Sequence, residues 1–135
     1  MEKRRILVVD DDPDIVDYLV TLLEDHHYEV SSACHASRAV ELMDECNPHA
    51  VLIDVLLPGR SGLDLLVTLR RHPSWAETPL VIVTGNDQIL QDDCQSYIGS
   101  HEGVRGPDGV LGKPIDQSTL LAVLDSIWAH GSSLL

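Results

Sequence analysis

The sequence predicts an α/β fold in which a five-stranded parallel sheet is flanked by five helices. Short runs rich in valine, isoleucine and leucine alternate with longer segments whose apolar residues recur at helical spacing, a pattern typical of repeated βα units. Four of the apolar runs are also followed directly by a polar side chain. These side chains are Asp10, Asp54, Thr84 and Lys113. Because the carboxyl ends of parallel strands share one edge of a sheet, where ligands bind, we expect these four side chains to meet there.

The first βα unit has the clearest pattern. Residues 5–9 form the first expected strand, and Asp12 followed by Pro13 suits the N-cap and first position of a helix. The apolar face of this helix consists of Ile15, Leu19, Leu22 and Leu23. A second, weaker strand is expected from Tyr28 to Ser32.

The middle of the chain repeats this alternation. A second helix is expected to end at Asn47-Pro48, and its apolar stripe consists of Ala36, Ala39, Val40 and Met43. Residues 50–53 form the third expected strand. A third helix follows and is expected to stop near Pro73, with Leu65, Leu66 and Leu69 on its apolar face.

The last third of the chain is less regular. Residues 80–83 form the fourth expected strand, and the fifth strand leads into Lys113. Between Thr84 and Lys113, where a fourth helix is also expected, glycines are frequent, so part of this stretch is expected to be loop. The final helix is expected from about Gln117 to His130, ended by Gly131.

Composition and charge limit the kinds of function. With 135 residues and 44% hydrophobic residues, the chain is expected to form one globular domain over residues 1–135. The net charge of -13 opposes direct binding to nucleic acid or to an anionic membrane, and favours a cation or a basic partner surface. The charged start of the chain is followed by an apolar run too short for export or membrane insertion. The three cysteines form no metal or disulfide motif, so the reducing cytoplasm is the expected location.

The aspartates at the strand ends predict a magnesium site. Taken singly, each has an ordinary explanation as a capping or turn residue. Adjacent carboxylates repel one another unless a cation neutralises them, and Mg²⁺ prefers hard oxygen ligands. We expect Asp11, Asp54 and the backbone carbonyl of Leu56 to bind the metal, with Asp10 acting through water.

The same edge of the sheet predicts phosphoryl chemistry. Asp54 would be the nucleophile that forms an acyl phosphate. Lys113 would contact a phosphoryl oxygen as a compact positive charge, and Thr84 would donate a hydrogen bond to the phosphorylated form.

The motifs together resemble the receiver domain of bacterial two-component response regulators over essentially the whole chain. The matching residues are Ile6 to Pro13, Asp54 with Pro58 and Gly62, Val83-Thr84-Gly85, and Gly112-Lys113-Pro114. The resemblance implies a doubly wound, flavodoxin-like fold with strand order 2-1-3-4-5. It implies phosphorylation of Asp54 by a histidine kinase or a histidine phosphotransfer protein, catalysed by the receiver itself, which usually also catalyses its own dephosphorylation. Output would pass to a downstream protein target by protein contact.

Three features depart from the family pattern. Val110 occupies a position, three before the lysine, where the family commonly has an aromatic switch residue. The stretch from Thr84 to Lys113 is longer and richer in glycine than usual, in a region that often carries partner or homodimer contacts. Leu56 lies two residues after Asp54, where an apolar side chain favours slow hydrolysis of the phosphate.

Two other functions remain open at this point. A receiver-like interaction module that no longer cycles phosphate would fit Val110 and the irregular fourth helix. The Asp10-x-Asp12 pair with Thr84 and Lys113 also resembles haloacid dehalogenase-like phosphatases, but this leaves Asp54 unexplained.

Overall fold

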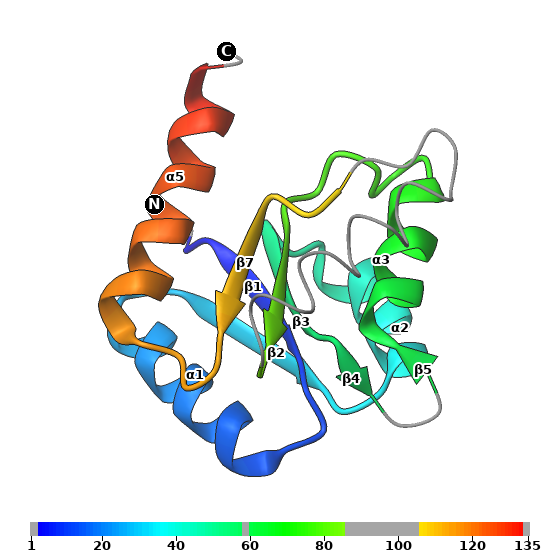
Figure 1. Cartoon of the computed structure of the whole chain (residues 1–135). Helices are drawn as coiled ribbons and strands as arrows, with labels where there is room; N and C mark the ends of the chain where they lie inside the picture. Colours follow the sequence, from blue (N-terminus) through cyan, green and yellow to red (C-terminus); the bar gives the residue numbers. More distant parts are fainter. Residues whose placement is uncertain (1–2, 58–59, 86–105, 134–135) are drawn as a thin grey trace.

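The computed structural model describes residues 3–57, 60–85 and 106–133. Its elements alternate as the sequence predicts (Figure 1). In chain order they are β1 (Arg5–Val9), α1 (Pro13–Asp25), β2 (Glu29–Ala33), α2 (Ala36–Cys46), β3 (Ala50–Asp54), β4 (Leu56–Leu57), β5 (Arg60–Ser61), α3 (Gly62–Arg71), β6 (Leu80–Thr84), β7 (Gly109–Gly112) and α5 (Gln117–Ser133).

The main sheet has five parallel strands in the order β2-β1-β3-β6-β7. Counted along this sheet alone, that is the predicted order 2-1-3-4-5. Alternate residues of each strand face opposite sides, so two separate apolar layers form. One layer packs α2 and α3 against the sheet, and the other packs α1 and α5 (Figure 1). The predicted doubly wound, flavodoxin-like fold is therefore confirmed.

Local signals placed most helix ends correctly. The Asp12 side chain caps α1 by accepting a hydrogen bond from the Asp14 N–H at 3.0 Å. Asn47 ends α2 in the left-handed conformation, with φ of 47°. The prediction that α5 ends before Gly131 was wrong, since the helix continues to Ser133. One glycine costs a helix only about 1 kcal/mol and need not stop it.

Two further differences concern the strands and the fourth helix. Strand β2 begins and ends one residue later than predicted. A small antiparallel hairpin, in which Leu56 pairs with Ser61 and Leu57 with Arg60, was not predicted. The expected fourth helix falls within residues 86–105, which lie outside the described residues. Within the described part of the chain, every helix is too short or too polar to span a bilayer.

Candidate functional site

Three carboxylates from two neighbouring strands meet at the carboxyl edge of the sheet. Asp10 and Asp11 follow β1, and Asp54 is the last residue of β3. One oxygen of each side chain lies within 4.8 Å of the others. Asp10 and Asp54 are 2% and 5% exposed, whereas Asp11 faces solvent. The strand-end prediction for these three residues thus agrees with the geometry.

Asp10 is held in place through both its backbone and its side chain. Its N–H donates to the Ala33 carbonyl at 3.1 Å, which extends the pairing of β1 with β2. Its Oδ1 accepts a hydrogen bond from the Asp12 N–H at 2.9 Å, while Oδ2 lies 3.2 Å from Lys113 Nζ. One oxygen therefore fixes the turn into α1, and the other faces the site.

Asp54 is fixed by the loop that follows it. Its Oδ1 accepts from the Leu56 N–H at 3.2 Å, and its Oδ2 accepts from Lys113 Nζ at 3.3 Å. Behind it, the Gly62 N–H donates to the Val55 carbonyl at 2.8 Å, which brings the start of α3 against the end of β3. Leu56, whose N–H contacts this carboxylate, is itself 74% exposed.

The electrostatics of Asp54 show how crowded these carboxylates are. Burial raises the pKa of Asp54, the Leu56 N–H lowers it, repulsion from Asp10 raises it, and Lys113 lowers it. The net shift is upward. The protein alone thus stabilises the Asp54 carboxylate less well than water does, and an added cation would remove this deficit.

Lys113 reaches the site from the end of the edge strand β7. Its backbone N–H donates to the Thr84 carbonyl at 2.7 Å, and the following Lys113-Pro114 peptide bond is cis. Burial lowers the pKa of Lys113, but attraction to Asp54 and Asp10 outweighs it, so the pKa is raised. Lys113 therefore stays protonated, and its positive charge lies between the two buried carboxylates.

Thr84 completes the row of strand ends. It is the last residue of β6, is 1% exposed, and pairs with Gly112 across to β7. Val83, just before it, pairs with Asp54. Thr84 is thus one step along the sheet from the acceptor strand end, as the sequence predicts.

The donor set fits a hard divalent cation. Three carboxylates face one another with one ammonium among them, which leaves excess negative charge at oxygen ligands that suit Mg²⁺. The predicted Leu56 carbonyl ligand stays a prediction, because the contact that the structure places at Leu56 is made by its N–H.

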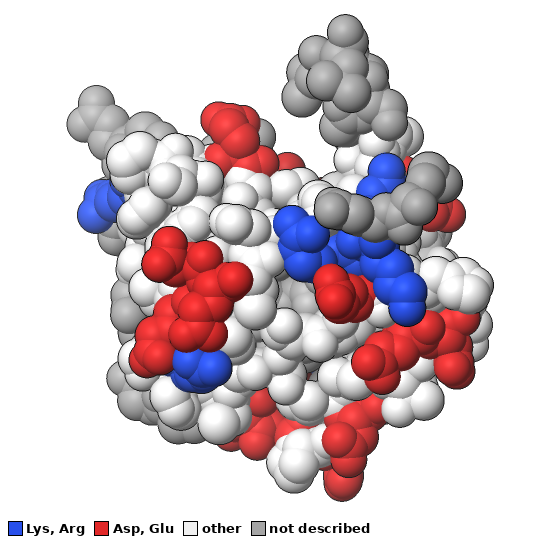
Figure 2. Space-filling view, turned by 180° about the vertical axis from the view of Figure 1, so that it is seen from behind, with Lys and Arg blue, Asp and Glu red and all other residues white. Residues whose placement is uncertain are grey.

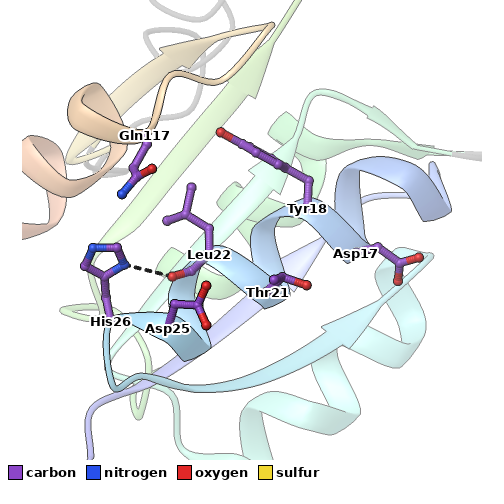
Figure 3. A pocket seen from close by; sticks show the side chains of 7 residues that line it. All are labelled: Asp17, Tyr18, Thr21, Leu22, Asp25, His26 and Gln117. Carbon is purple, nitrogen blue, oxygen red and sulfur yellow. Dashed lines mark hydrogen bonds between the residues drawn. The ribbon is translucent and has the colours of Figure 1, made fainter.

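A groove beside the site was not predicted from the sequence. It has a volume of about 450 Å³ and runs along α1 to the start of α5; its lining residues are Asp17, Tyr18, Thr21, Leu22, Asp25, His26 and Gln117 (Figure 3). The Tyr18 hydroxyl donates to the Ile115 carbonyl at 3.0 Å, which braces the loop after Lys113. Asp17 also lines a second, separate hollow together with Asp10 and Asp11.

A second residue that the sequence analysis missed is Arg70, whose side chain is 2% exposed. Arg70 follows Leu63 by seven positions, on the apolar face of α3. A charged residue at a core position of a helix was the signal that could have found it.

Acidic groups outside the site are dispersed. On the face seen in Figure 2, Asp and Glu side chains form several separate groups rather than one continuous patch. On this face, the excess of acidic groups therefore does not by itself mark a binding site.

Comparison with known proteins gives both family and fold relatives. The family model of the response regulator receiver domain matches residues 6–125. Protein PilH of Pseudomonas aeruginosa is 32% identical over 125 residues, which cover 93% of this chain and 98% of PilH. The DNA-binding dual master transcriptional regulator RpaA of Synechocystis is 33% identical over 87% of this chain, but the match covers 46% of RpaA, so the chain spans about half of that relative.

Solved structures of receiver proteins have the same fold as this chain. A CheY-like response regulator receiver domain from Methylobacillus flagellatus has a TM-score of 0.76 and 28% identity, over 93% of this chain and 99% of that one. The chemotaxis response regulator CheY4 of Vibrio cholerae has a TM-score of 0.79 and 24% identity, with the same coverage, which supports the fold. These matches give no support to the phosphatase alternative.

Proposed function

This chain belongs to the family of response regulator receiver domains, and we propose that Asp54 is the residue at which it is phosphorylated. Membership makes it a phosphorylation-dependent signalling switch of a two-component system. The observation that carries the assignment is the buried Asp54 carboxylate, held between the Leu56 N–H and Lys113 Nζ beside Asp10 and Asp11. We propose that residues 1–135 act as one receiver domain.

The side chains around Asp54 fit the transfer step. An Asp54 oxygen attacks phosphorus, an O–P bond forms, and the N–P bond to the phosphohistidine of the donor breaks, leaving the electron pair on the imidazole nitrogen. Lys113 Nζ lies 3.3 Å from Asp54 Oδ2. After the transfer it would contact a negatively charged phosphoryl oxygen instead. Thr84, at the neighbouring strand end, donates a hydrogen bond from its hydroxyl to another phosphoryl oxygen.

The metal role belongs to Asp10, Asp11 and Asp54. We propose that Asp11, Asp54 and the Leu56 carbonyl bind Mg²⁺ directly and that Asp10 acts through water. The ion would neutralise charge on the equatorial phosphoryl oxygens. With it in place, the chain catalyses both its own phosphorylation and its dephosphorylation.

The groove along α1 suits the donor protein. We propose that a histidine kinase or a histidine phosphotransfer protein lays a basic surface on this groove, whose rim carries Asp17 and Asp25. Asp17 lines both this groove and the hollow that Asp10 and Asp11 line, so a partner that contacts Asp17 would lie next to both cavities. Output passes to a downstream protein through a separate contact. A second copy of this chain, in a homodimer, is a further proposed partner. A cytoplasmic location fits the free thiols of Cys34 and Cys46.

A small-molecule phosphodonor tests the proposed function without the cognate kinase. The protein is incubated with acetyl phosphate with and without Mg²⁺, and its intact mass is recorded. We expect the gain of one phosphoryl group with Mg²⁺ and essentially none after chelation, because the excess negative charge repels the donor. Fragmentation should place the group on the peptide that contains Asp54. Absence of both phosphoryl gain and Mg²⁺ binding would instead favour a phosphate-independent interaction module.

Leu56 is expected to lengthen the life of the phosphorylated state. Leu56 is exposed and its N–H contacts the acceptor, and its isobutyl side chain has no group that could orient or deprotonate an attacking water. We expect a half-life well beyond seconds in the wild type, shortened at least several-fold by Leu56→Asn. The measurement is the decay of the phosphorylated mass after donor removal. Leu56→Met is the matched control and should keep the slow decay; a wild-type lifetime of seconds would contradict the expectation.

A further inference from the structure

Strand β7, which carries Lys113 into the site, has one buried side chain to fix its register. It has four residues, two of them glycines, and it lies at the edge of the sheet (Figure 1). Leu111 is its one buried residue, and the neighbouring Val110 is a half-buried apolar side chain that could take its place. Register is weakly specified in such strands.

A slip of one residue would move Lys113 by about 3.3 Å along the strand and turn its side chain to the other face. That displacement is as large as the distances of 3.2 and 3.3 Å that join Lys113 Nζ to Asp10 and Asp54. The position of Lys113 in the site thus depends on what holds the two ends of β7.

At its start β7 is anchored by Arg70 of α3. Arg70 Nη2 donates to Asp108 Oδ2 at 2.7 Å and to the Gly106 carbonyl at 3.1 Å. The same Asp108 Oδ2 accepts from the Leu80 N–H at 2.9 Å, and the Asp108 N–H donates to the Leu80 carbonyl at 2.7 Å. Asp108, the residue just before β7, is therefore hydrogen-bonded to both the N–H and the carbonyl of Leu80, the first residue of β6.

The guanidinium itself is firmly placed. Its Nη1 donates to the carbonyls of Ala76 at 3.1 Å and Thr78 at 2.6 Å, in the segment between α3 and β6. Five donors in a rigid plane allow one side chain to join the end of α3, the start of β6 and the start of β7. At the other end of the strand, the Lys113 N–H is bound to the Thr84 carbonyl at 2.7 Å.

From this geometry we propose that Arg70 is a positioning residue for phosphoryl transfer: through Asp108 and Gly106 it sets the register of β7 and so holds Lys113 against Asp54. The inference rests on the proposed function of Asp54 and Lys113. It assigns Arg70 no contact with the phosphoryl group. Asp10 and Asp11 follow β1 and Asp54 ends β3, so loss of the anchor does not displace these carboxylates. Moving the Lys113 charge away from them would not weaken their affinity for Mg²⁺.

The test compares Arg70→Lys with the wild type, each with Lys113 intact and with Lys113→Met. Lysine keeps the charge facing Asp108 but cannot reach the other acceptors. Initial rates of phosphoryl gain from acetyl phosphate are measured at saturating Mg²⁺, and Mg²⁺ affinity is measured by calorimetry. We expect Arg70→Lys to slow phosphorylation about tenfold, since misplacement by about 1 Å can cost a hundredfold. The Mg²⁺ affinity should not fall, and with Lys113→Met, followed over hours, Arg70→Lys should cause no further slowing.

Matched variants make the outcome decisive. Arg38→Lys alters an exposed arginine on α2 and should leave the rate unchanged. If Arg70→Lys does not fold, Asp108→Asn, which keeps an acceptor for the Leu80 N–H, takes its place. An unchanged rate, an equal slowing with and without Lys113, or a parallel loss of Mg²⁺ affinity would overturn the inference. A wild type that gains no phosphoryl group at Asp54 would overturn the proposed function and the inference with it.

Discussion

Asp54→Asn is expected to abolish phosphoryl gain from acetyl phosphate. The amide keeps the size of the carboxylate and can still accept the Leu56 N–H through its oxygen. It has no anionic oxygen to attack phosphorus, and its NH₂ group would face Lys113 Nζ, donor against donor. Intact mass after incubation with Mg²⁺ measures the effect. Asp125→Asn, the same change at an exposed position of α5, should leave the gain intact.

The stability of metal-free Asp54→Asn separates lost chemistry from lost folding. The pKa of Asp54 is raised by folding, so the native state binds more protons than the unfolded state between the two pKa values. Stability therefore falls as pH rises through that window, and at neutral pH the ionised carboxylate is a net cost. We expect the asparagine variant to be more stable than the wild type in urea at neutral pH without Mg²⁺. A variant that is both unreactive and less stable would contradict this assignment.

The site was predictable because each of its residues follows a strand that its own sequence identifies. Asp54 ends the run Ala50–Ile53, and Lys113 follows Val110–Gly112, so periodicity alone places both side chains at one edge of a parallel sheet. The order of the strands needed the family resemblance as well. Local composition states where each strand ends but not which strand lies beside which.

What the sequence did not reveal depends on contacts between distant residues. Arg70 and Asp108 are 38 residues apart, and neither lies in a motif. Their pairing appears only when α3 packs beside the start of β7. The groove along α1 is similar, because Gln117 joins its lining only through the fold. Periodicity in the sequence indicates which face of a helix or strand is buried. The Arg70–Asp108 pair and the groove depend on which other element packs against that face.

Gly62→Ala is expected to be the most damaging glycine substitution among those the structure describes. A Cβ at this position would lie 2.1 Å from the Asp54 carbonyl oxygen and 2.9 Å from Ile53 Cγ2. The backbone of β3 cannot yield as a flexible side chain would, so either α3 or the end of β3 must shift. Overpacking typically costs 1–3 kcal/mol, and a clash with backbone belongs at the upper end, so we expect a loss of about 3 kcal/mol or more. Urea unfolding measures it.

The loss should appear despite an opposing local effect. Alanine favours a helix over glycine by about 1 kcal/mol, and Gly62 is the first residue of α3, so propensity alone predicts a gain. Gly85→Ala is the matched control, because among the described residues no atom beyond its chain neighbours lies within 4 Å of a Cβ there, and its stability should stay within about 0.5 kcal/mol of the wild type. Since the clash falls on the carbonyl of Asp54 itself, whatever Gly62→Ala protein remains folded should also accept phosphate more slowly. Equal stability of the two alanine variants would show that α3 does not press against β3 at the acceptor.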